Sequence, residues 1–170
     1  MIIWINGAYG VGKTTTAKML KRKITKGKKG KVKILNSDCY FNCFVKKNLL
    51  LVYGGTLPQN NLNFIKYFKE IIEKEIKYNI LIIDMALTEK ECKSLLFEPL
   101  NDTYDILHII LTGSDEIIKS RINSDKTSER DISFLPSNLE FLKNNFDDAI
   151  RIDTSKKKPD AIVTEILRYF

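Results

Sequence analysis

The feature that most constrains this chain is a glycine-rich segment near its start. Residues Gly7 to Thr14 read G-A-Y-G-V-G-K-T and satisfy the pattern G-x-x-x-x-G-K-[ST]. The run Ile2–Ile5 before it is continuously apolar, as in a strand that is covered on both faces. From Lys13 onward, apolar residues recur at helical spacing. A strand, this turn and a helix form the context in which such a segment binds phosphate groups.

The residue types of the segment suit a nucleoside triphosphate. Glycines allow backbone N–H groups to converge on phosphate oxygens, and the Lys13 ammonium reaches the same oxygens. The Thr14 hydroxyl is suited to ligate magnesium. We therefore expect ATP and Mg²⁺ as cofactors, with the nucleotide bound by Gly7, Ala8, Tyr9, Gly10, Val11, Gly12, Lys13, Thr14 and Thr15.

Strands and helices alternate along the rest of the chain. Further strands are predicted at Val32–Leu35, Asn79–Ile83, Ile106–Leu111 and Ala149–Ile152. Helical patterns lie between them, and two capping boxes are predicted, at Thr88 with Glu91 and at Ser137 with Glu140. This alternation predicts an α/β fold in which helices cover both faces of a parallel sheet.

Length and composition exclude several classes of protein. A chain of 170 residues fits one domain, taken as residues 1–170, and no apolar run is long enough to cross a bilayer. The odd number of cysteines and the absence of nearby histidines argue against a zinc site at Cys39, Cys43 and Cys92. Reduced thiols are typical of the cytoplasm, where we expect the protein.

The net charge of +7 is concentrated in one segment, residues 21–33. Eight bases and no acid occur there, and without them 20 basic residues stand against 21 acidic ones. A solvated helix end and loop explains the run, because cations are favoured at a helix C-terminus. A polyanion site is the alternative, although the run holds no aromatic residue for base stacking.

Two aspartates follow predicted strands and are candidates for chemistry. Asp38 comes shortly after the second strand, where a carboxylate is placed to take the proton of an attacking hydroxyl, or simply to cap a helix. Asp84 ends the third strand, as does an acid that holds magnesium in phosphate-binding proteins, although turns also favour aspartate. We assign Asp38 as the catalytic base and Thr14 with Asp84 as metal ligands.

The first residues resemble a known family. The run I-I-W-I-N-G-A from Ile2 to Ala8, leading into the glycine-rich loop, closely resembles the start of the tunicamycin-resistance proteins. These belong with the nucleoside-monophosphate-kinase-like P-loop proteins, beside chloramphenicol phosphotransferase and the shikimate and gluconate kinases. The resemblance implies a three-layer P-loop NTPase fold with sheet order 2-3-1-4-5, a short lid at about 123–136 and a substrate-binding insertion at about 39–77.

The same resemblance implies roles for further residues. In the resembling kinases, lid arginines neutralise the transferred phosphoryl group, which points to Arg121 and Arg130 as catalytic beside Lys13. The backbone that follows the fifth strand passes the adenine, which places Thr154 at the nucleotide. Tyr9, Tyr40, Phe41 and Phe44 either line an acceptor pocket or belong to the core, as His108 does.

Three functions remain open. We favour an ATP-dependent kinase for a hydroxyl of a small molecule, with antibiotics and nucleoside-like compounds as candidate acceptors. The second is a polynucleotide 5′-hydroxyl kinase that uses the basic run 21–33, and the third is a resistance protein that binds ATP and a drug without transfer. A GTPase is disfavoured because no N-K-x-D motif occurs, and a transporter ATPase because no L-S-G-G-Q motif occurs. The oligomeric state is not predicted.

Overall fold

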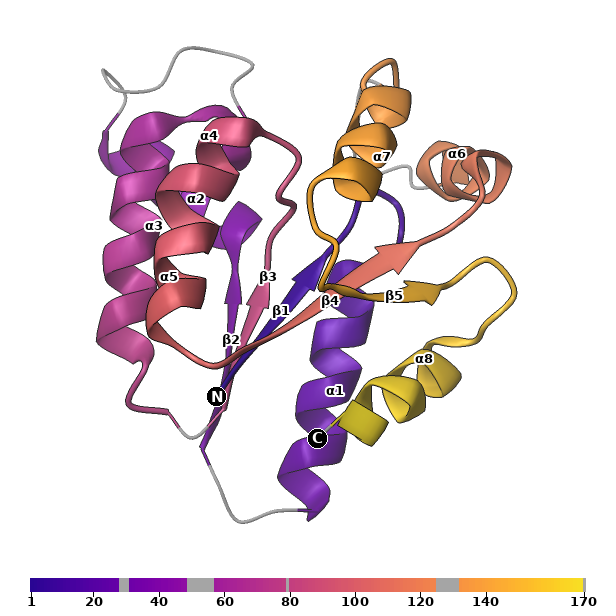
Figure 1. Ribbon diagram of the computed structural model, residues 1–170, viewed down its shortest axis with the longest axis horizontal. Helices are drawn as coiled ribbons and strands as arrows, with labels where there is room; N and C mark the ends of the chain where they lie inside the picture. The colour runs from indigo at the N-terminus through magenta and orange to yellow at the C-terminus, as the bar shows by residue number, and fades with distance from the viewer. Residues whose placement is uncertain (28–30, 49–56, 79, 125–131, 170) are drawn as a thin grey trace.

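A five-stranded parallel sheet forms the centre of the molecule (Figure 1). The computed structural model describes residues 1–27, 31–48, 57–78, 80–124 and 132–169. The strand order is β2-β3-β1-β4-β5, as expected. The strands are β1 (Ile2–Asn6), β2 (Val32–Asn36), β3 (Ile80–Asp84), β4 (Ile106–Thr112) and β5 (Ile150–Asp153). Each strand extends one residue beyond the apolar run that predicts it and ends on a polar side chain.

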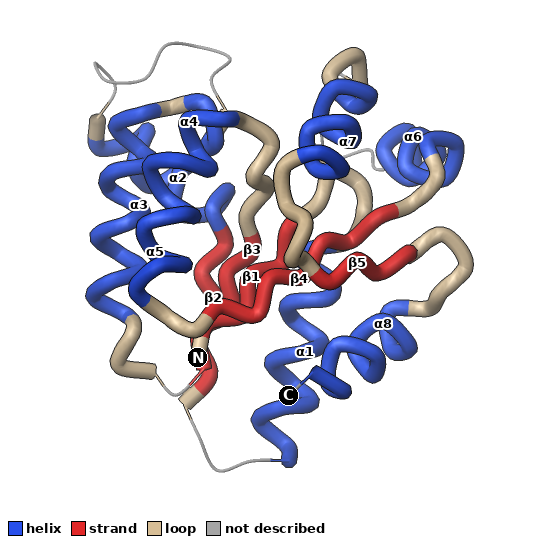
Figure 2. Tube along the Cα trace, in the orientation of Figure 1, coloured by secondary structure: helices blue, strands red, loops and turns tan. Residues whose placement is uncertain are grey.

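Helices cover both faces of this sheet, so the three-layer α/β fold is confirmed. α1 and α8 lie on one face, α2, α3 and α5 lie on the other, and α6 and α7 stand beyond the carboxyl ends of β4 and β5 (Figures 1 and 2). The helices are α1 (Lys13–Gly27), α2 (Ser37–Lys47), α3 (Leu62–Glu75), α4 (Lys90–Cys92), α5 (Glu98–Thr103), α6 (Asp115–Ser124), α7 (Leu135–Asn144) and α8 (Pro159–Ile166), with short turns η2 (Pro58–Asn60), η3 (Lys93–Phe97) and η4 (Leu167–Tyr169).

The core follows from the apolar strands and from one stripe on each long helix. All five residues of β1 and all five of β3 are buried, because both strands are central and covered on both faces. α3 buries apolar residues three and four apart, Phe64, Ile65, Phe68 and Ile72. Among the described residues, no helix is long and apolar enough to cross a membrane.

Both predicted capping boxes are wrong. α4 begins after Glu89 without a side-chain cap, and the buried Thr88 hydroxyl has no partner among the described residues. α7 begins at Leu135, where Pro136 fixes the first turn, and the Ser137 hydroxyl donates to the Phe134 carbonyl at 3.0 Å. The S/T-x-x-E pattern caps no helix in either place. The Ser137 hydroxyl bonds to another carbonyl, and the Thr88 hydroxyl has no partner among the described residues.

The strand register gathers polar side chains at one edge of the sheet. Asn36 of β2 stands beside Asp84 of β3, and Thr112 of β4 stands beside Asp153 of β5. The chain turns from β1 into the glycine-rich loop at this edge. Because carboxyl ends of parallel strands meet at one edge, the predicted site residues converge there.

Candidate functional site

The loop between β1 and α1 depends on glycine backbone conformations. Gly7, Gly10 and Gly12 have φ values of +141°, +80° and +101°, in the region that side chains disfavour. A Cβ atom on Gly7 would also lie 2.6 Å from the carbonyl oxygen of Leu111. These conformations turn the chain directly from strand to helix, which opens at Lys13 with its N-terminus toward the loop.

Asn6 fixes the start of this loop. Its side-chain oxygen accepts from the backbone N–H of Gly7 at 2.7 Å and from that of Leu87 at 2.9 Å. Its amide nitrogen donates to Nε2 of His108 at 3.1 Å. Burial, with Arg151 nearby, lowers the pKa of His108 to about 3, so its neutral ring accepts this hydrogen bond. His108 is thus the hydrogen-bonded core residue that its place in an apolar strand predicts.

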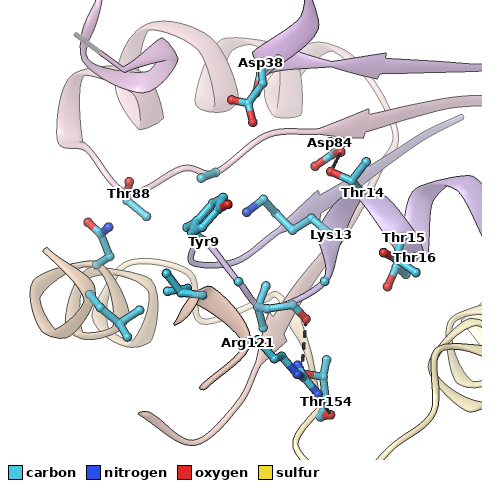
Figure 3. Close-up of a pocket in the computed structure, with 18 of the residues that line it drawn as sticks. Tyr9, Lys13, Thr14, Thr15, Thr16, Asp38, Asp84, Thr88, Arg121 and Thr154 are labelled. Atoms are coloured by element: carbon cyan, nitrogen blue, oxygen red, sulfur yellow. Dashed lines mark hydrogen bonds between the residues drawn. The ribbon is translucent and has the colours of Figure 1, made fainter. Parts of the chain in front are cut away.

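Lys13 lies over the mouth of the loop. Its ammonium donates to the carbonyl oxygens of Gly7 at 2.8 Å and Ala8 at 3.1 Å. Figure 3 shows the amine reaching into the cavity beside the ring of Tyr9. The side chain is therefore held where the sequence pattern places the phosphate-binding lysine.

Thr14, Asp84 and Asn36 form a hydrogen-bonded group at the opening of α1. The Thr14 hydroxyl donates to Oδ2 of Asp84 at 2.7 Å, and the Asn36 amide donates to the same oxygen at 2.6 Å. The Asp84 side chain is 2% exposed. Burial of a carboxylate at this depth requires partners, and both partners leave its other oxygen for a ligand.

This group fits a magnesium ion. Mg²⁺ binds hard oxygen ligands and usually retains waters, with one or two protein side chains and the substrate phosphates completing its shell. A threonine hydroxyl beside a carboxylate supplies that donor set. Within the described residues there is no cluster of three or more His, Cys, Asp or Glu side chains that would form a metal cage. The Thr14 hydroxyl with the single Asp84 carboxylate suits an ion that is shared with phosphates.

Asp38 faces the same space from another element. It lies in the first turn of α2, and Figure 3 shows its carboxylate directed toward the region between Tyr9 and Lys13. The helix N-cap, which was the alternative use of Asp38, is Asn36, whose side-chain oxygen accepts from the Cys39 N–H at 2.9 Å. Asp38 is therefore not the helix cap, and its residue belongs to the cavity wall.

Arg121 and Thr154 are joined to each other. The Arg121 guanidinium donates to Oγ1 of Thr154 at 3.0 Å and to its carbonyl oxygen at 2.9 Å (Figure 3). The Thr154 hydroxyl lies against the loop, within hydrogen-bond distance of the Val11 carbonyl at 3.3 Å. The pair thus stands on the flank of the loop opposite Asp38. Arg130 lies outside the described residues, as do all of residues 125–131 of the expected lid.

A cavity of about 1020 Å³ unites these groups. Most predicted site residues line it: Tyr9, Gly10, Val11, Gly12, Lys13, Thr14, Thr15, Asp38, Asp84, Arg121 and Thr154. Gly7 and Ala8 shape the loop behind the cavity surface. Of the candidate aromatic residues, Tyr9 and Phe41 line the cavity, whereas Tyr40 and Phe44 pack against the rings of α3. The volume of the cavity lies at the upper end of the range that is usual for small-molecule binding sites.

The sequence did not identify several residues of the site. Asn6 holds the start of the loop, and Asn36 holds the Asp84 carboxylate. The cavity lining also includes Thr88, Phe134 and Asn138. The one signal for the two asparagines is their place directly after an apolar strand. Thr88, Phe134 and Asn138 gave no signal in the sequence. They come together only when α7 and the segment after β3 fold over the edge of the sheet.

Comparisons with known proteins agree with this architecture. The chain matches no protein-family model and no curated protein sequence. Its structure is similar to that of the tunicamycin resistance protein of Deinococcus radiodurans, with a TM-score of 0.75 and 21% identity over 99% of this chain and 94% of that one.

Two kinases show the same likeness. Shikimate kinase from Bacteroides thetaiotaomicron has a TM-score of 0.67 and 15% identity over 99% of this chain and 97% of that one. The APS kinase CysC of Mycobacterium tuberculosis, solved with AMPPNP and APS, has a TM-score of 0.63 and 13% identity over 98% and 95% of the two chains. Strand order, phosphate loop and these likenesses together show that this chain has the fold of the P-loop kinases.

Proposed function

We propose that this protein is an ATP- and Mg²⁺-dependent kinase that phosphorylates a hydroxyl group of a small molecule. One observation carries the proposal: the Thr14–Asp84 pair at the phosphate loop and the Asp38 carboxylate face one cavity from different strands and helices. A phosphate-binding loop alone supports nucleotide binding. A second carboxylate across the cavity is what phosphoryl transfer to a hydroxyl additionally requires.

The proposed reaction is a direct transfer. The acceptor oxygen attacks the γ-phosphorus, the bond from that phosphorus to the bridging oxygen of ADP breaks, and the hydroxyl proton passes to Asp38. Lys13 and the N–H groups of the loop hold the phosphates during the transfer. Arg121 and Arg130 keep their proposed role in neutralising charge, Arg121 from the Thr154 side of the cavity.

Thr14 and Asp84 are the proposed magnesium ligands. A bound Mg²⁺ ion supplies positive charge to the β- and γ-phosphates. Asn36 contributes by holding the Asp84 carboxylate in place through its amide at 2.6 Å. The expected lid at about 123–136 is proposed to exclude water from the transfer, as lids of phosphotransferases do.

Transfer of label from γ-labelled ATP tests the proposal. Purified protein, Mg²⁺ and labelled ATP are incubated with a panel of nucleosides, nucleotides, sugars, tunicamycin and other hydroxyl-bearing antibiotics, and products are separated. Label on a small acceptor is the expected result. ATP that binds but transfers no label to any acceptor contradicts the kinase and favours a resistance protein that binds without transfer.

A second candidate, a polynucleotide 5′-hydroxyl kinase, has one structural observation in its favour. A groove of about 540 Å³ on α1 is lined by Lys18, Lys21, Arg22, Thr25, Lys26 and Ile34. Other bases of the run are paired, Lys23 with Asp160 and Lys33 with Glu75, each at 2.8 Å. Figure 1 shows α1 leading away from the phosphate loop, so a bound strand would have to follow the helix to reach it.

Binding of a single-stranded oligonucleotide at varied salt separates the two candidates. Contacts to several phosphates give affinity that falls steeply as salt rises. Such binding, together with label on a 5′-hydroxyl oligonucleotide, favours the second candidate. Absence of binding at low salt excludes it and leaves the groove as solvated surface.

A further inference from the structure

His108 is a buried polar side chain that the proposed reaction does not use. It lies in β4 with 9% of its surface exposed, and it is not among the described residues of the cavity lining. Its ring packs on Phe97 and Phe146, with ring centroids 4.5 and 4.9 Å away. An apolar side chain would fill such a place without losing hydrogen bonds to water, so the imidazole requires a polar explanation.

The polar contact of His108 is to Asn6 at the end of β1. The register of β1 and β4 sets His108 beside Trp4, and Asn6 follows two residues later on the same face of the strand. The Asn6 amide nitrogen donates to Nε2 of the ring at 3.1 Å. Because burial lowers the pKa of His108 to about 3, the ring is neutral at neutral pH and its Nε2 accepts this hydrogen bond.

The other side of the same amide faces two backbone N–H groups. Its oxygen accepts from Gly7 at 2.7 Å and from Leu87 at 2.9 Å. Two donors on the oxygen leave the amide NH₂ group directed away from them, and Asn6 is fully buried. The NH₂ group therefore needs an acceptor inside the protein, and the His108 ring supplies it.

Gly7 and Leu87 belong to two different parts of the cavity. Gly7 opens the phosphate loop with φ +141°, and because glycine adopts many conformations, bonds to its neighbours must select this one. Leu87 lies in the segment after β3, between Ala86 and Thr88 of the cavity lining. One amide thus fixes the backbone of the phosphate loop and the backbone of the segment after β3.

Loss of the acceptor at His108 would act on both segments through Asn6. A buried NH₂ group without a partner costs free energy, and the amide relieves this cost by rotating toward another acceptor. Rotation takes its oxygen away from the N–H groups of Gly7 and Leu87. We infer that His108 is a positioning residue of the nucleotide site, which holds the Asn6 amide in the orientation that fixes the phosphate loop.

This inference rests on the proposed function, because it concerns the loop that binds ATP. It goes beyond that function by giving a role to a side chain outside the cavity lining, which acts through Asn6 alone. The alternative is that His108 only fills space in the core among the rings of Phe97 and Phe146.

Two substitutions of His108 separate positioning from packing. His108→Leu keeps an apolar side chain among the rings and removes the acceptor, whereas His108→Gln retains an oxygen that accepts from Asn6. If His108 only filled the core, leucine would be the better replacement, whereas positioning predicts that glutamine is better. Phe97→Leu is the matched control, because it alters the same aromatic cluster at a side chain that cannot bond to Asn6.

Hydrogen exchange of single amides measures the hold of Asn6 on the backbone. The Gly7 and Leu87 amides should exchange at least tenfold faster in His108→Leu than in the wild type, because their acceptor is displaced. The amide of Ile3 in the same central strand reports global unfolding and corrects for any loss of stability. In the glutamine variant and in Phe97→Leu, the Gly7 and Leu87 amides should change no more than this reference.

Binding of AMPPNP measures the consequence for the nucleotide site. Affinity should fall about tenfold in His108→Leu and stay near wild type in His108→Gln and Phe97→Leu. The effect should disappear when Asn6 is already replaced, so adding His108→Leu to Asn6→Ala should change the affinity less than about twofold. Equal losses in the two backgrounds would show that His108 does not act through Asn6.

The wild-type protein gives a test that needs no variant. Nitrogen NMR of His108 at neutral pH should show the neutral tautomer that carries its proton on Nδ1 and none on Nε2. A proton on Nε2 would overturn the inference, because the Asn6 NH₂ group would then face another donor.

The outcomes separate this inference from the proposed function. Wild-type protein that does not bind AMPPNP contradicts the kinase, and amide exchange then decides the inference alone. Unchanged exchange of the Gly7 and Leu87 amides in His108→Leu overturns the inference and leaves the kinase. Equal effects of leucine and glutamine at position 108 also overturn it, because packing alone explains them.

Discussion

At the scale of single residues, Gly12 of the phosphate loop is required for its backbone conformation rather than for space. Gly12 has φ +101°, yet a Cβ atom there would meet nothing within 4 Å. Gly12→Ala should therefore act through the backbone alone and cost about 1–2 kcal/mol, or change the loop conformation and weaken ATP binding. Denaturant unfolding and nucleotide titration measure the two effects.

Gly27 provides the control for this prediction. It ends α1 without positive φ, and a Cβ atom would also meet nothing within 4 Å. Gly27→Ala should be neutral or stabilise the protein by about 0.5–1 kcal/mol, because alanine restricts the unfolded chain. Equal effects of the two substitutions would show that the φ value of Gly12 is not important.

The Thr14 hydroxyl is predicted to serve magnesium rather than folding. Thr14→Val keeps the shape of the side chain and removes the bond to Asp84. Turnover should fall at least tenfold and require more Mg²⁺, because the ion loses a ligand. Mg²⁺ titrations of turnover test this, with Thr25→Val on the exposed end of α1 as the control. Unchanged Mg²⁺ dependence in Thr14→Val contradicts the assignment.

Residue types explain what the sequence predicts at this scale. Lys13 and Thr14 belong to a sequence pattern in which each position has a chemical reason, so their position at the loop could be predicted from the sequence alone. Asn36 carries no such pattern, and its bond to Asp84 exists because the register sets β2 beside β3. Arg121 was predicted from a resemblance, and its bond to Thr154 depends on how α6 meets the turn after β5.

At the scale of elements, Asn36 links the metal site to the helix that carries Asp38. Its oxygen caps α2 and its amide holds Asp84, so one side chain positions both carboxylates. Asn36→Ala should destabilise the protein by about 1–3 kcal/mol and lower turnover at least tenfold. Unfolding and steady-state kinetics measure the two effects separately.

Asn61 is the matched control for Asn36. It caps α3 by accepting from the Phe64 N–H at 2.8 Å and is not among the described residues of the cavity lining. Asn61→Ala should lose stability through the same capping effect but leave the turnover of the folded protein unchanged. If Asn36→Ala also leaves turnover unchanged, Asn36 is only a helix cap.

Elements with a strong apolar pattern were predictable, and short ones were not. Every strand and the helices α1, α3, α6 and α8 follow from runs or stripes that burial requires. The predicted cap at Ser137 failed because its hydroxyl bonds to the Phe134 carbonyl and Pro136 lies in the first turn of α7, whereas α4 begins after Glu89 and leaves the Thr88 hydroxyl without a partner among the described residues. The π-helical turn η3 (Lys93–Phe97) also has no signal in the sequence.

At the scale of the whole molecule, stability should depend on the neutral state of His108. Its pKa is about 3 when folded and near 6.5 when unfolded, so the unfolded chain takes up a proton first as pH falls. His108 therefore leaves the free energy of unfolding almost unchanged above about pH 6.5 and lowers it by about 2 kcal/mol at pH 5.

His108→Gln isolates this effect, because glutamine retains an acceptor for Asn6 without titrating. The free energy of unfolding, measured at pH 7 and pH 5, should fall about 2 kcal/mol more in the wild type than in the variant. Equal losses would show that His108 is not held neutral.

The arrangement of the whole sheet is predictable only in part from residues. Alternating strands and helices indicate a parallel α/β sheet, but the order 2-3-1-4-5 came from the resemblance of Ile2–Ala8 to a family. The side of the cavity that α2, η2 and α7 form could not be predicted, because these elements are distant in sequence and meet only in the folded chain.

The shared cavity is the central claim, and Asp38→Asn tests it most directly. With an acceptor from the labelling panel, the variant should lose at least a hundredfold in kcat, because no base takes the hydroxyl proton. Its affinity for ATP should stay unchanged, and Asp102→Asn, at an exposed acid outside the cavity lining, should behave as wild type. Full turnover by Asp38→Asn would contradict the account.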